Sequence, residues 1–275
     1  MTVHSHSTGG GEPRVAEGPD IMLIARALAT KWCGCSIISV SPGPRCPSVR
    51  NLSSVILPST LRSIGCHGSM VWFDIDERIL TVSVGQHTRV MANDGADPRY
   101  VALAIAVSDG TFIYFVDHRR YVNARIVEPS DVRRYVNVTG PNVTDLGRAD
   151  VKRVSDAAIT VERTVSEALA DDAVLTGVGQ RLASEALYAA RISPWRPAHA
   201  VTQHEWGKVL NALHVESMRA LSIGLAASVH EHVPSLSWSI PAIVYGRTRL
   251  DDGTQLVSER CTASWMLTWA PGVQT

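Results

Sequence analysis

Hydrophobic and polar positions divide the chain into four stretches of different period. After Pro19, apolar side chains recur three and four positions apart, which predicts a helix with one buried face. Apolar and polar positions then alternate as far as about residue 125, which is typical of strands that bury one face. The period is helical again from about residue 150, and short strand-like pieces follow Trp238. The pattern therefore predicts a helix, a β-rich part, a helical part and a β tail.

The first helix and the strands after it can be placed from particular residues. We expect the helix to begin near Pro19, because proline suits a first helical turn. Its inward stripe is Ile21, Ile24, Ala25 and Leu28. A turn at residues 76–78 joins two strands, whose inward faces are Val71, Phe73 and Ile75 and then Leu80, Val82 and Val84. Asp109-Gly110 between two apolar runs predicts a hairpin with a type I′ turn, which favours small residues with positive φ.

The helical part shows two inward stripes. The first stripe is Val161, Val165, Ala168 and Leu169. Thr202 and Glu205 have the spacing of a capping box, which predicts the start of a long helix. The inward face of that helix is Trp206, Val209, Leu210 and Leu213. In the β tail, Asp252-Gly253 predicts a turn between two short strands.

The composition permits nucleic-acid binding without predicting it. The 275 residues are 45% apolar, which is enough for one or two hydrophobic cores. Lys+Arg and Asp+Glu both number 26, so no overall field attracts a polyanion and any such affinity has to come from local patches. Lysine occurs at only three positions, and the remaining arginines suit forked contacts with phosphate. A GC-rich genome would produce the same bias, which leaves this point open.

Cysteine usage and hydropathy indicate a cytoplasmic protein. The five cysteines form no paired framework, and we find no signal peptide or long apolar run. Cys33 and Cys35 with Cys46 and Cys66 permit a zinc interpretation. A spacing of one residue between zinc ligands is unusual and buried thiols are common, so we expect no metal. Residues 1–15 are rich in Gly, Ser, Thr and His without periodicity, and we expect them to be disordered.

Residues 176–188 carry the most informative motif, a glycine-punctuated turn that leads into a short helix. Gly177 and Gly179 let the backbone come close to a ligand. The first N–H groups of a helix have no partners within it, and such an end attracts an anion. We therefore expect a phosphate contact at this turn, with a plain helix connection as the alternative.

The order of residues in this motif resembles the helix–two-turns–helix segment of the formamidopyrimidine-DNA glycosylase/endonuclease VIII family, which grips DNA. Gln180 stands where that family normally has asparagine. Six shorter matches lie in the family's order along the chain. They are residues 15–19, 66–69, 84–87, 117–121, 244–247 and 268–274.

The resemblance implies an α+β fold with an N-terminal helix plus β-sandwich, a helical helix–two-turns–helix domain and a C-terminal β-hairpin finger. We expect a disordered extension, a catalytic-type sandwich domain, a linker, a DNA-binding helical domain and a finger. Their expected bounds are 1–15, 16–125, 126–150, 151–235 and 236–275.

The finger is expected to lack zinc. The four cysteines that the family uses there are absent, and Ala270 and Val273 stand at the last two positions. We expect hairpin pairing and the packing of Trp265 and Trp269 to hold the finger instead. The resemblance implies no other cofactor.

Two adjacent residues carry the chemistry that the resemblance implies. In the family, the N-terminal amine attacks the sugar C1′ and expels the damaged base through a Schiff base, while an adjacent glutamate handles protons. Glu17 keeps that glutamate and is the expected catalytic residue; a carboxylate that merely suits a helix start is the alternative. Ala16 replaces the proline, and because fifteen residues precede it, its nitrogen is an amide. If translation starts at a GTG codon for Val15, position 15 is methionine, and removal of this methionine exposes the amine of Ala16. Ala16 is therefore the expected nucleophile only if it is the mature N-terminus.

Other departures from the family bear on DNA contact. Ser69 replaces a lysine and Trp265 replaces the finger arginine, which removes two cationic phosphate clamps and should weaken strand cleavage. Gln86 replaces the methionine that is inserted into the base stack, whereas Arg119 and Tyr121 keep the pair that fills the gap left by an everted base. The expected DNA-binding residues are Ser69, Gln86, Arg119, Tyr121, Gly177, Gly179, Gln180 and Trp265.

We therefore expect a DNA-repair glycosylase-like protein that binds damaged duplex DNA as a monomer. It would evert an alkylated or oxidised base and cleave the N-glycosidic bond, with weak or absent AP-lyase activity. Its expected location is the cytoplasm, at the nucleoid and away from membranes. A catalytically inactive descendant that binds DNA lesions is the second interpretation, because three of four chemically important positions have changed. A reused fold without a DNA role is the third, and salt-dependent duplex binding would exclude it.

Overall fold

The computed structural model describes residues 16–44, 49–50, 52, 56–85, 88–93, 95–228, 240–262 and 265–275. The predicted disorder of residues 1–15, the predicted contact at Gln86 and the thiol of Cys46 lie outside these residues.

Helix α1 (Gly18–Trp32) begins where the sequence predicts a helix, with Pro19 in its first turn. The carboxylate of Asp20 accepts a hydrogen bond from the backbone N–H of Glu17 at 2.9 Å, which fixes the helix start. The four residues of the predicted stripe are all buried, with at most 4% of any one exposed.

Nine strands form one sheet in the part of the chain that the structure describes. They are β1 (Ser36–Pro42), β2 (Val49–Arg50), β3 (Ser59–His67), β4 (Met70–Ile75), β5 (Arg78–Ser83), β6 (Thr88–Ala92), β7 (Val101–Val107), β8 (Phe112–Asp117) and β9 (Asn123–Val127). Their order across the sheet is β2-β9-β5-β4-β3-β1-β7-β8-β6. Every pair is antiparallel except β2 with β9.

The sheet folds over on itself, so that two layers share one core. β4 and β8 are four strands apart, which would separate them by roughly 19 Å in a flat sheet. Phe73 on β4 and Phe115 on β8 nevertheless meet edge to face, with ring centroids 6.1 Å apart. Both rings are fully buried in a cluster that also contains the inward stripe of α1. The predicted helix plus β-sandwich is confirmed.

The β7–β8 hairpin is confirmed, but the predicted type I′ turn is wrong. Gly110 has a φ of 85°, whereas Asp109 is not among the residues with positive φ. Hydrogen bonds from Gly110 N–H to Val107 O and from Val107 N–H to Thr111 O make a type I turn followed by a left-handed glycine. Asp109 stays outside the left-handed region, where its carboxylate accepts from the N–H of Thr111 and from the indole of Trp32.

The rest of the chain up to residue 228 is helical. Its helices are α2 (Pro129–Val138), η2 (Val143–Asp145), α3 (Asp150–Ala158), α4 (Val165–Leu169), α5 (Gln180–Ala190), η3 (Ala198–Ala200) and α6 (Gln203–Ser228). The expected linker 126–150 therefore contains α2 and η2. The pattern did not indicate α2, because Val132 is its only buried residue.

The two predicted helical stripes differ in outcome. The capping box at the start of α6 is confirmed, since Thr202 and Glu205 bond reciprocally and the four inward residues are buried. The first stripe is wrong at Val161, which is 61% exposed. α3 ends before it, because the Arg163 guanidinium bonds the carbonyls of Ala157 and Ala158 in the last turn of that helix.

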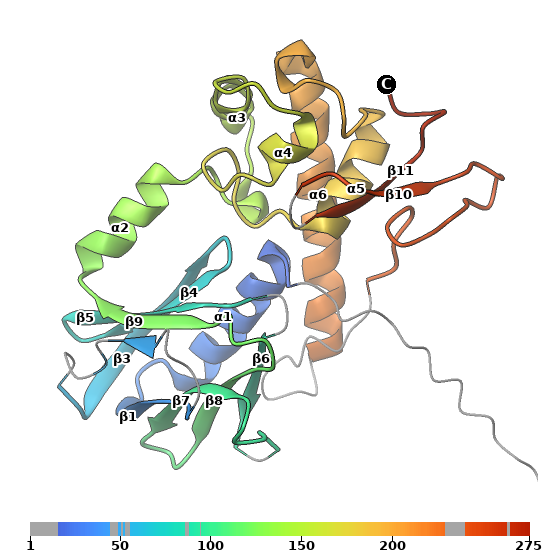
Figure 1. Cartoon of the computed structure of the whole chain (residues 1–275). Helices are drawn as coiled ribbons and strands as arrows, with labels where there is room; N and C mark the ends of the chain where they lie inside the picture. The colour runs from blue at the N-terminus through green and yellow to red at the C-terminus, as the bar shows by residue number, and fades with distance from the viewer. Residues whose placement is uncertain are drawn as a thin grey trace, which may run out of the picture.

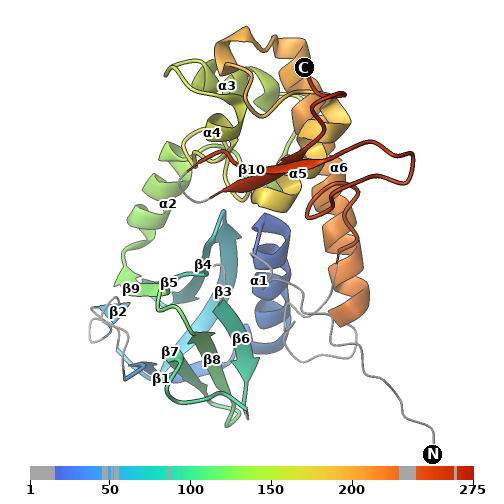
Figure 2. The same cartoon turned by 45° about the vertical axis from the view of Figure 1, so that its right-hand side comes forward.

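The C-terminal hairpin consists of β10 (Val257–Arg260) and β11 (Met266–Trp269). It lies beside α5, and α1 lies between the sheet and the long helix α6 (Figure 1 and Figure 2). The Asp252-Gly253 turn is confirmed, with Gly253 at a φ of 89°. Among the described helices, none has both the length and the apolar character needed to span a membrane.

Candidate active site

A cavity of about 310 Å³ opens where turns of the sheet face the glycine turn that precedes α5. The start of α1 and the tip of the C-terminal hairpin complete its wall. Seven of the ten predicted site residues lie in this wall: Ala16, Glu17, Ser69, Tyr121, Gly177, Gly179 and Trp265. The structure therefore brings together residues that are up to 249 positions apart in the chain (Ala16 and Trp265).

The Glu17 carboxylate occupies the N-terminal end of α5. Its Oε1 accepts hydrogen bonds from the backbone N–H groups of Arg181 at 2.9 Å and Leu182 at 3.1 Å. The unpaired donors of a helix start attract an anion, as the sequence predicts, but here the anion is a side chain of the same protein. Glu17 is only 4% exposed and still reaches the wall of the cavity.

The two glycines allow this close approach. A Cβ at Gly179 would lie 2.3 Å from Oε1 of Glu17, so no larger residue fits there without displacing the carboxylate. Gly177 has a φ of 79°, which favours glycine, and its carbonyl accepts from the N–H of Gly18 at 2.8 Å. The predicted phosphate contact at these glycines stays a prediction.

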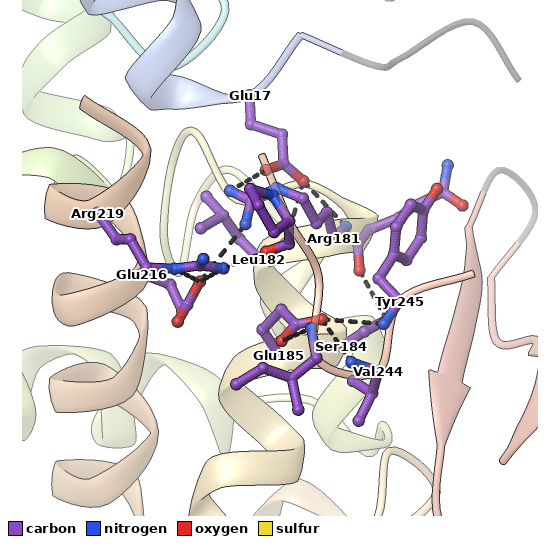
Figure 3. A network of polar contacts seen from close by, with 12 residues as sticks. Glu17, Arg181, Leu182, Ser184, Glu185, Glu216, Arg219, Val244 and Tyr245 are labelled. Atoms are coloured by element: carbon purple, nitrogen blue, oxygen red, sulfur yellow. Dashed lines mark hydrogen bonds and ion pairs between the residues drawn. The ribbon is translucent and has the colours of Figure 1, made fainter. Parts of the chain in front are cut away.

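Glu17 belongs to a chain of charges that leads from the interior to the partly exposed Arg219 (Figure 3). A guanidinium nitrogen of Arg181 lies 3.1 Å from Oε2 of Glu17, and the two side chains are 8% and 2% exposed. A second nitrogen of Arg181 lies 3.5 Å from Oε2 of Glu216 on α6. Arg219 pairs with the same Glu216 oxygen at 3.0 Å. The order is carboxylate, guanidinium, carboxylate, guanidinium, so charges of opposite sign alternate.

Further residues of α5 hold the C-terminal hairpin and the segment that precedes it. Gln180 is 9% exposed, and its Oε1 accepts from the backbone N–H of Met266 at 2.8 Å. The hydroxyl of Ser184, one turn later, accepts from Thr268 N–H at 3.1 Å. The Glu185 carboxylate accepts from three successive backbone N–H groups, those of residues 243–245 (Figure 3). Gln180 therefore links α5 to the hairpin in this structure, and its predicted contact with phosphate stays a prediction.

The hairpin tip reaches the cavity through Trp265. This side chain is 8% exposed and packs in the hydrophobic cluster of the helical part. Further along, Gln274 is 3% exposed, accepts from Ala270 N–H and donates to the carbonyl of Ile192. The indoles of Trp195 and Trp269 both donate to the Glu259 carboxylate. Hydrogen bonds thus supplement the predicted hairpin pairing and tryptophan packing.

The β3–β4 turn presents Ser69 to the cavity. Gly68 has a φ of 57° within it. His67 is buried, and its Nε2 lies 2.9 Å from the hydroxyl of Thr139 and 3.3 Å from that of Thr176. Burial lowers the pKa of His67. These contacts fix the Ser69 turn against the glycine turn of the helical part.

Asp117 organises the loop that carries Arg119 and Tyr121. Its carboxylate accepts from the backbone N–H groups of Arg119, Tyr121 and Val122 while only 2% exposed. Arg120, between the two predicted residues, has a φ of 62°. The Tyr121 side chain is 65% exposed and lies at the cavity, whereas Arg119 is exposed on the same loop outside the cavity wall.

Sequence reasoning missed Arg181 and Glu216. One signal could have found Glu216, because extending the inward stripe of α6 beyond Leu213 by three positions reaches it. A carboxylate on a buried helix face needs a partner, which here is Arg181. Arg181 itself carries no such signal, since its burial depends on α1 and α6, which pack around the α5 start.

The cysteines do not gather with other ligands in the described residues. No group of three or more His, Cys, Asp or Glu side chains suited to a metal ion occurs there. Cys33, Cys35 and Cys66 are free thiols, and burial raises the pKa of Cys66 to about 11.

Comparison with known proteins finds formamidopyrimidine-DNA glycosylases. The protein of that name from Geobacter metallireducens is 27% identical over 242 residues, which are 84% of this chain and 88% of that protein. The one from Mycolicibacterium smegmatis is 26% identical over 71% of this chain and 73% of its own length. No family model matches the chain.

Solved structures share the fold. The Lactococcus lactis enzyme Fpg in complex with abasic-site DNA superimposes with a TM-score of 0.80 at 16% identity, covering 94% of this chain and 99% of that one. MutM (Fpg) from Thermus thermophilus gives 0.78 at 22% identity, covering 94% and 98%. The α+β fold and the resemblance predicted from the motifs are confirmed.

Proposed function

We propose that this chain, a divergent relative of the formamidopyrimidine-DNA glycosylase/endonuclease VIII family, is a DNA glycosylase that acts on damaged duplex DNA. One observation carries the proposal: the buried carboxylate of Glu17 reaches the wall of a cavity that is bounded by seven predicted site residues. Its volume of about 310 Å³ lies within the range of roughly 300–1,000 Å³ for small-molecule sites. We infer that an everted base and its sugar enter this cavity.

The surroundings of the cavity suit the contacts of a bent duplex. Arg119 and Tyr121 are exposed on one rigid loop and would fill the gap that the everted base leaves. The N–H groups of the glycine turn and the side chain of Gln180 would contact the phosphate of the everted nucleotide. In this proposal, residues 16–125 hold the base, residues 151–235 grip the strand, and the finger at 236–275 closes the site, in one monomer at the nucleoid.

Glu17 would stabilise the positive charge that develops on the sugar while the N-glycosidic bond breaks. In a hydrolytic reaction, water oxygen forms the new bond to C1′, the electrons of the broken bond leave with the base, and the base takes up the proton that water loses. Ala16 nitrogen would attack instead only where Ala16 is the mature N-terminus. Ser69 and Trp265 at positions of two cationic clamps support weak or absent AP-lyase activity.

Base release from lesion-containing duplexes tests this proposal. Duplexes that carry one oxidised or one alkylated nucleotide report base release. A duplex with one abasic nucleotide reports strand cleavage, and borohydride is added in parallel to trap any Schiff base. We expect Glu17→Gln to lower base release by roughly 100-fold or more, because the charge beside the sugar is lost. Glu162→Gln, at an exposed glutamate that does not line the cavity, should release bases like the unmodified protein. Equal release by Glu17→Gln would refute a catalytic role for Glu17.

A lesion-binding protein without catalysis is the second candidate. It is favoured by the engagement of Glu17 with two backbone N–H groups and the Arg181 guanidinium, which a purely structural carboxylate would also show. This candidate predicts tight binding to lesion-containing duplex with no base release at any pH. Both candidates predict binding that weakens steeply with salt, and a lack of duplex binding at low ionic strength would contradict both.

A further inference from the structure

Arg181 and Glu216 place two charges in the protein interior behind Glu17. Their side chains are 8% and 12% exposed, and they come from different helices, α5 and α6. Removing a charge from water costs free energy unless a charge of opposite sign lies beside it, so each of these charges needs such a partner. Each has one, because Arg181 lies between the carboxylates of Glu17 and Glu216, and Arg219 supplies the second positive charge beside Glu216 (Figure 3).

The position of Arg181 makes it the cation that acts most directly on Glu17. Its guanidinium lies 3.1 Å from Oε2, while its backbone N–H bonds Oε1 of the same carboxylate. Further charged or titratable groups lie on the same helix, in the same cavity wall or in the same chain of ion pairs as Glu17. These are Asp20 on α1, Asp172 before the glycine turn, Tyr121 on the β8–β9 loop, and Glu216 with Arg219 on α6.

We propose that Arg181 is a positioning residue that holds the Glu17 carboxylate in its orientation and in its charged form, and that Glu216 sets the strength of this effect. Glu216 shares the guanidinium and adds a negative charge of its own, so it opposes the action of Arg181 on Glu17. This inference rests on the proposed function, since Glu17 is the group through which Arg181 would affect base release.

The two partners therefore have opposite effects on the charge of Glu17. A nearby cation favours an ionised carboxylate, and a nearby anion disfavours it. Arg181→Met should move the acid limb of the base-release profile to higher pH by about one unit. Glu216→Gln should move it to lower pH. A residue that merely supported the fold would lower activity in both variants without shifting the limb in opposite directions.

The experiment measures pH–rate profiles and the titration of Glu17 itself. Carbon-13 carboxyl signals are followed by NMR in glutamate-labelled protein, and the Glu17 signal is the one missing from Glu17→Gln. Arg181→Lys keeps the charge and should restore the position of the limb. Arg196→Met is the matched control, because it breaks a partly buried pair with Glu205, neither residue lines the cavity, and the change should shift neither readout.

If Arg181→Met does not fold, a double variant still tests the proposal. The double variant Arg181→Met/Glu216→Gln removes one charge of each sign, so it keeps the interior balanced. Its limb should still lie at higher pH than that of the unmodified protein, because Arg181 is the nearer of the two groups to Glu17. A double variant with an unshifted limb and an unshifted Glu17 titration would overturn the proposal.

The two readouts separate failure of this inference from failure of the proposed function. If the protein releases bases but the Glu17 titration shifts in the same direction in both single variants, or does not shift, the role of Arg181 is overturned and the proposed function stands. Opposite shifts of the Glu17 titration without base release from any duplex overturn the proposed function and support the positioning role. Opposite shifts in both readouts support both.

Discussion

At the scale of single residues, Glu17 combines a structural contact with a place in the cavity wall. Its carboxylate completes the N-terminal end of α5 and lies at the wall of the cavity. A side chain that is held by two backbone donors and one guanidinium loses little further freedom when a ligand binds, which favours precise placement. The same bonds tie the first turn of α1 to α5, so changes beside Glu17 should affect both activity and stability.

Gly179→Ala tests this double role. The φ of Gly179 is −121°, which any residue can adopt, so the conflict is purely steric, with the new Cβ 2.3 Å from Oε1 and 2.4 Å from Cγ of Glu17. We expect a loss of about 1–3 kcal/mol in the free energy of unfolding and a strong loss of base release. Denaturant unfolding and the release assay measure these effects. Gly272→Ala is the control, because no atom lies within 4 Å of its added Cβ; equal behaviour of the two variants would contradict the steric argument.

Part of this site could be predicted from single residues. Gly177 and Gly179 follow from the motif at residues 176–188, because glycine spacing and a helix start are local features. Glu17 follows from the resemblance to the glycosylase family. Arg181 could not be predicted, since its partners Glu17 and Glu216 lie 164 positions before and 35 positions after it. Ion pairs between residues so far apart in the sequence depend on how whole helices pack. The hydrophobic period and the spacing of motif residues contain no information on that packing.

At the scale of elements, α5 connects the functional parts. Its start holds Glu17, and its side chains at positions 180 and 184 hold the C-terminal hairpin. Glu185 holds the segment 243–245 that precedes the hairpin. The helix itself was predicted from the glycine turn before it, but its polar partners were not. α2 was missed for the opposite reason, since a helix with one buried residue has no stripe to detect. Turn types also escaped prediction, because side-chain acceptors such as Asp109 decide them.

The β8–β9 loop is the element whose rigidity can be tested by one substitution. Asp117→Ala removes the acceptor of three backbone N–H groups and leaves Arg120 in a left-handed conformation without that support. We expect a loss of about 1–3 kcal/mol in stability and weaker binding of lesion-containing duplex, because Arg119 and Tyr121 lose their fixed positions.

Fluorescence anisotropy with a labelled duplex measures the affinity, and denaturant unfolding measures the stability. Asp97→Ala is the matched control, since Asp97 pairs with Arg99 on an exposed surface, where such pairs contribute little. Unchanged affinity in Asp117→Ala would show that the loop does not take part in binding.

At the scale of the whole molecule, the cavity lies at the joint between the sandwich and the helical part. Three kinds of contact close this joint: the Glu17 bonds to α5, the bond between Gly18 and Gly177, and the hydrogen bonds of His67 to Thr139 and Thr176. The order of the parts along the chain was predictable, because each has its own period. The joint was not predictable, because its contacts are made by polar groups that do not recur at regular intervals in the sequence.

Protonation of His67 should loosen this joint and make stability depend on pH. Burial lowers the pKa of His67 in the folded protein below its ordinary value of 6.5. Between the lowered value and 6.5, the unfolded chain binds a proton that the folded protein does not, so stability falls as the pH falls through this window and is unaffected by His67 above it. The slope contributed by one such group is at most about 1.4 kcal/mol per pH unit.

His67→Gln keeps a hydrogen-bonding side chain without a proton to gain. We expect urea unfolding of this variant to show a flatter dependence on pH below 6.5 than the unmodified protein, although carboxylates contribute to both curves. Subtracting the two curves isolates His67, because the carboxylates are common to both. His199→Gln, at an exposed histidine, should reproduce the unmodified slope. Parallel curves for His67→Gln and the unmodified protein would mean that His67 takes up its proton equally well in the folded state, and the joint would then have no sensitivity to acid at this residue.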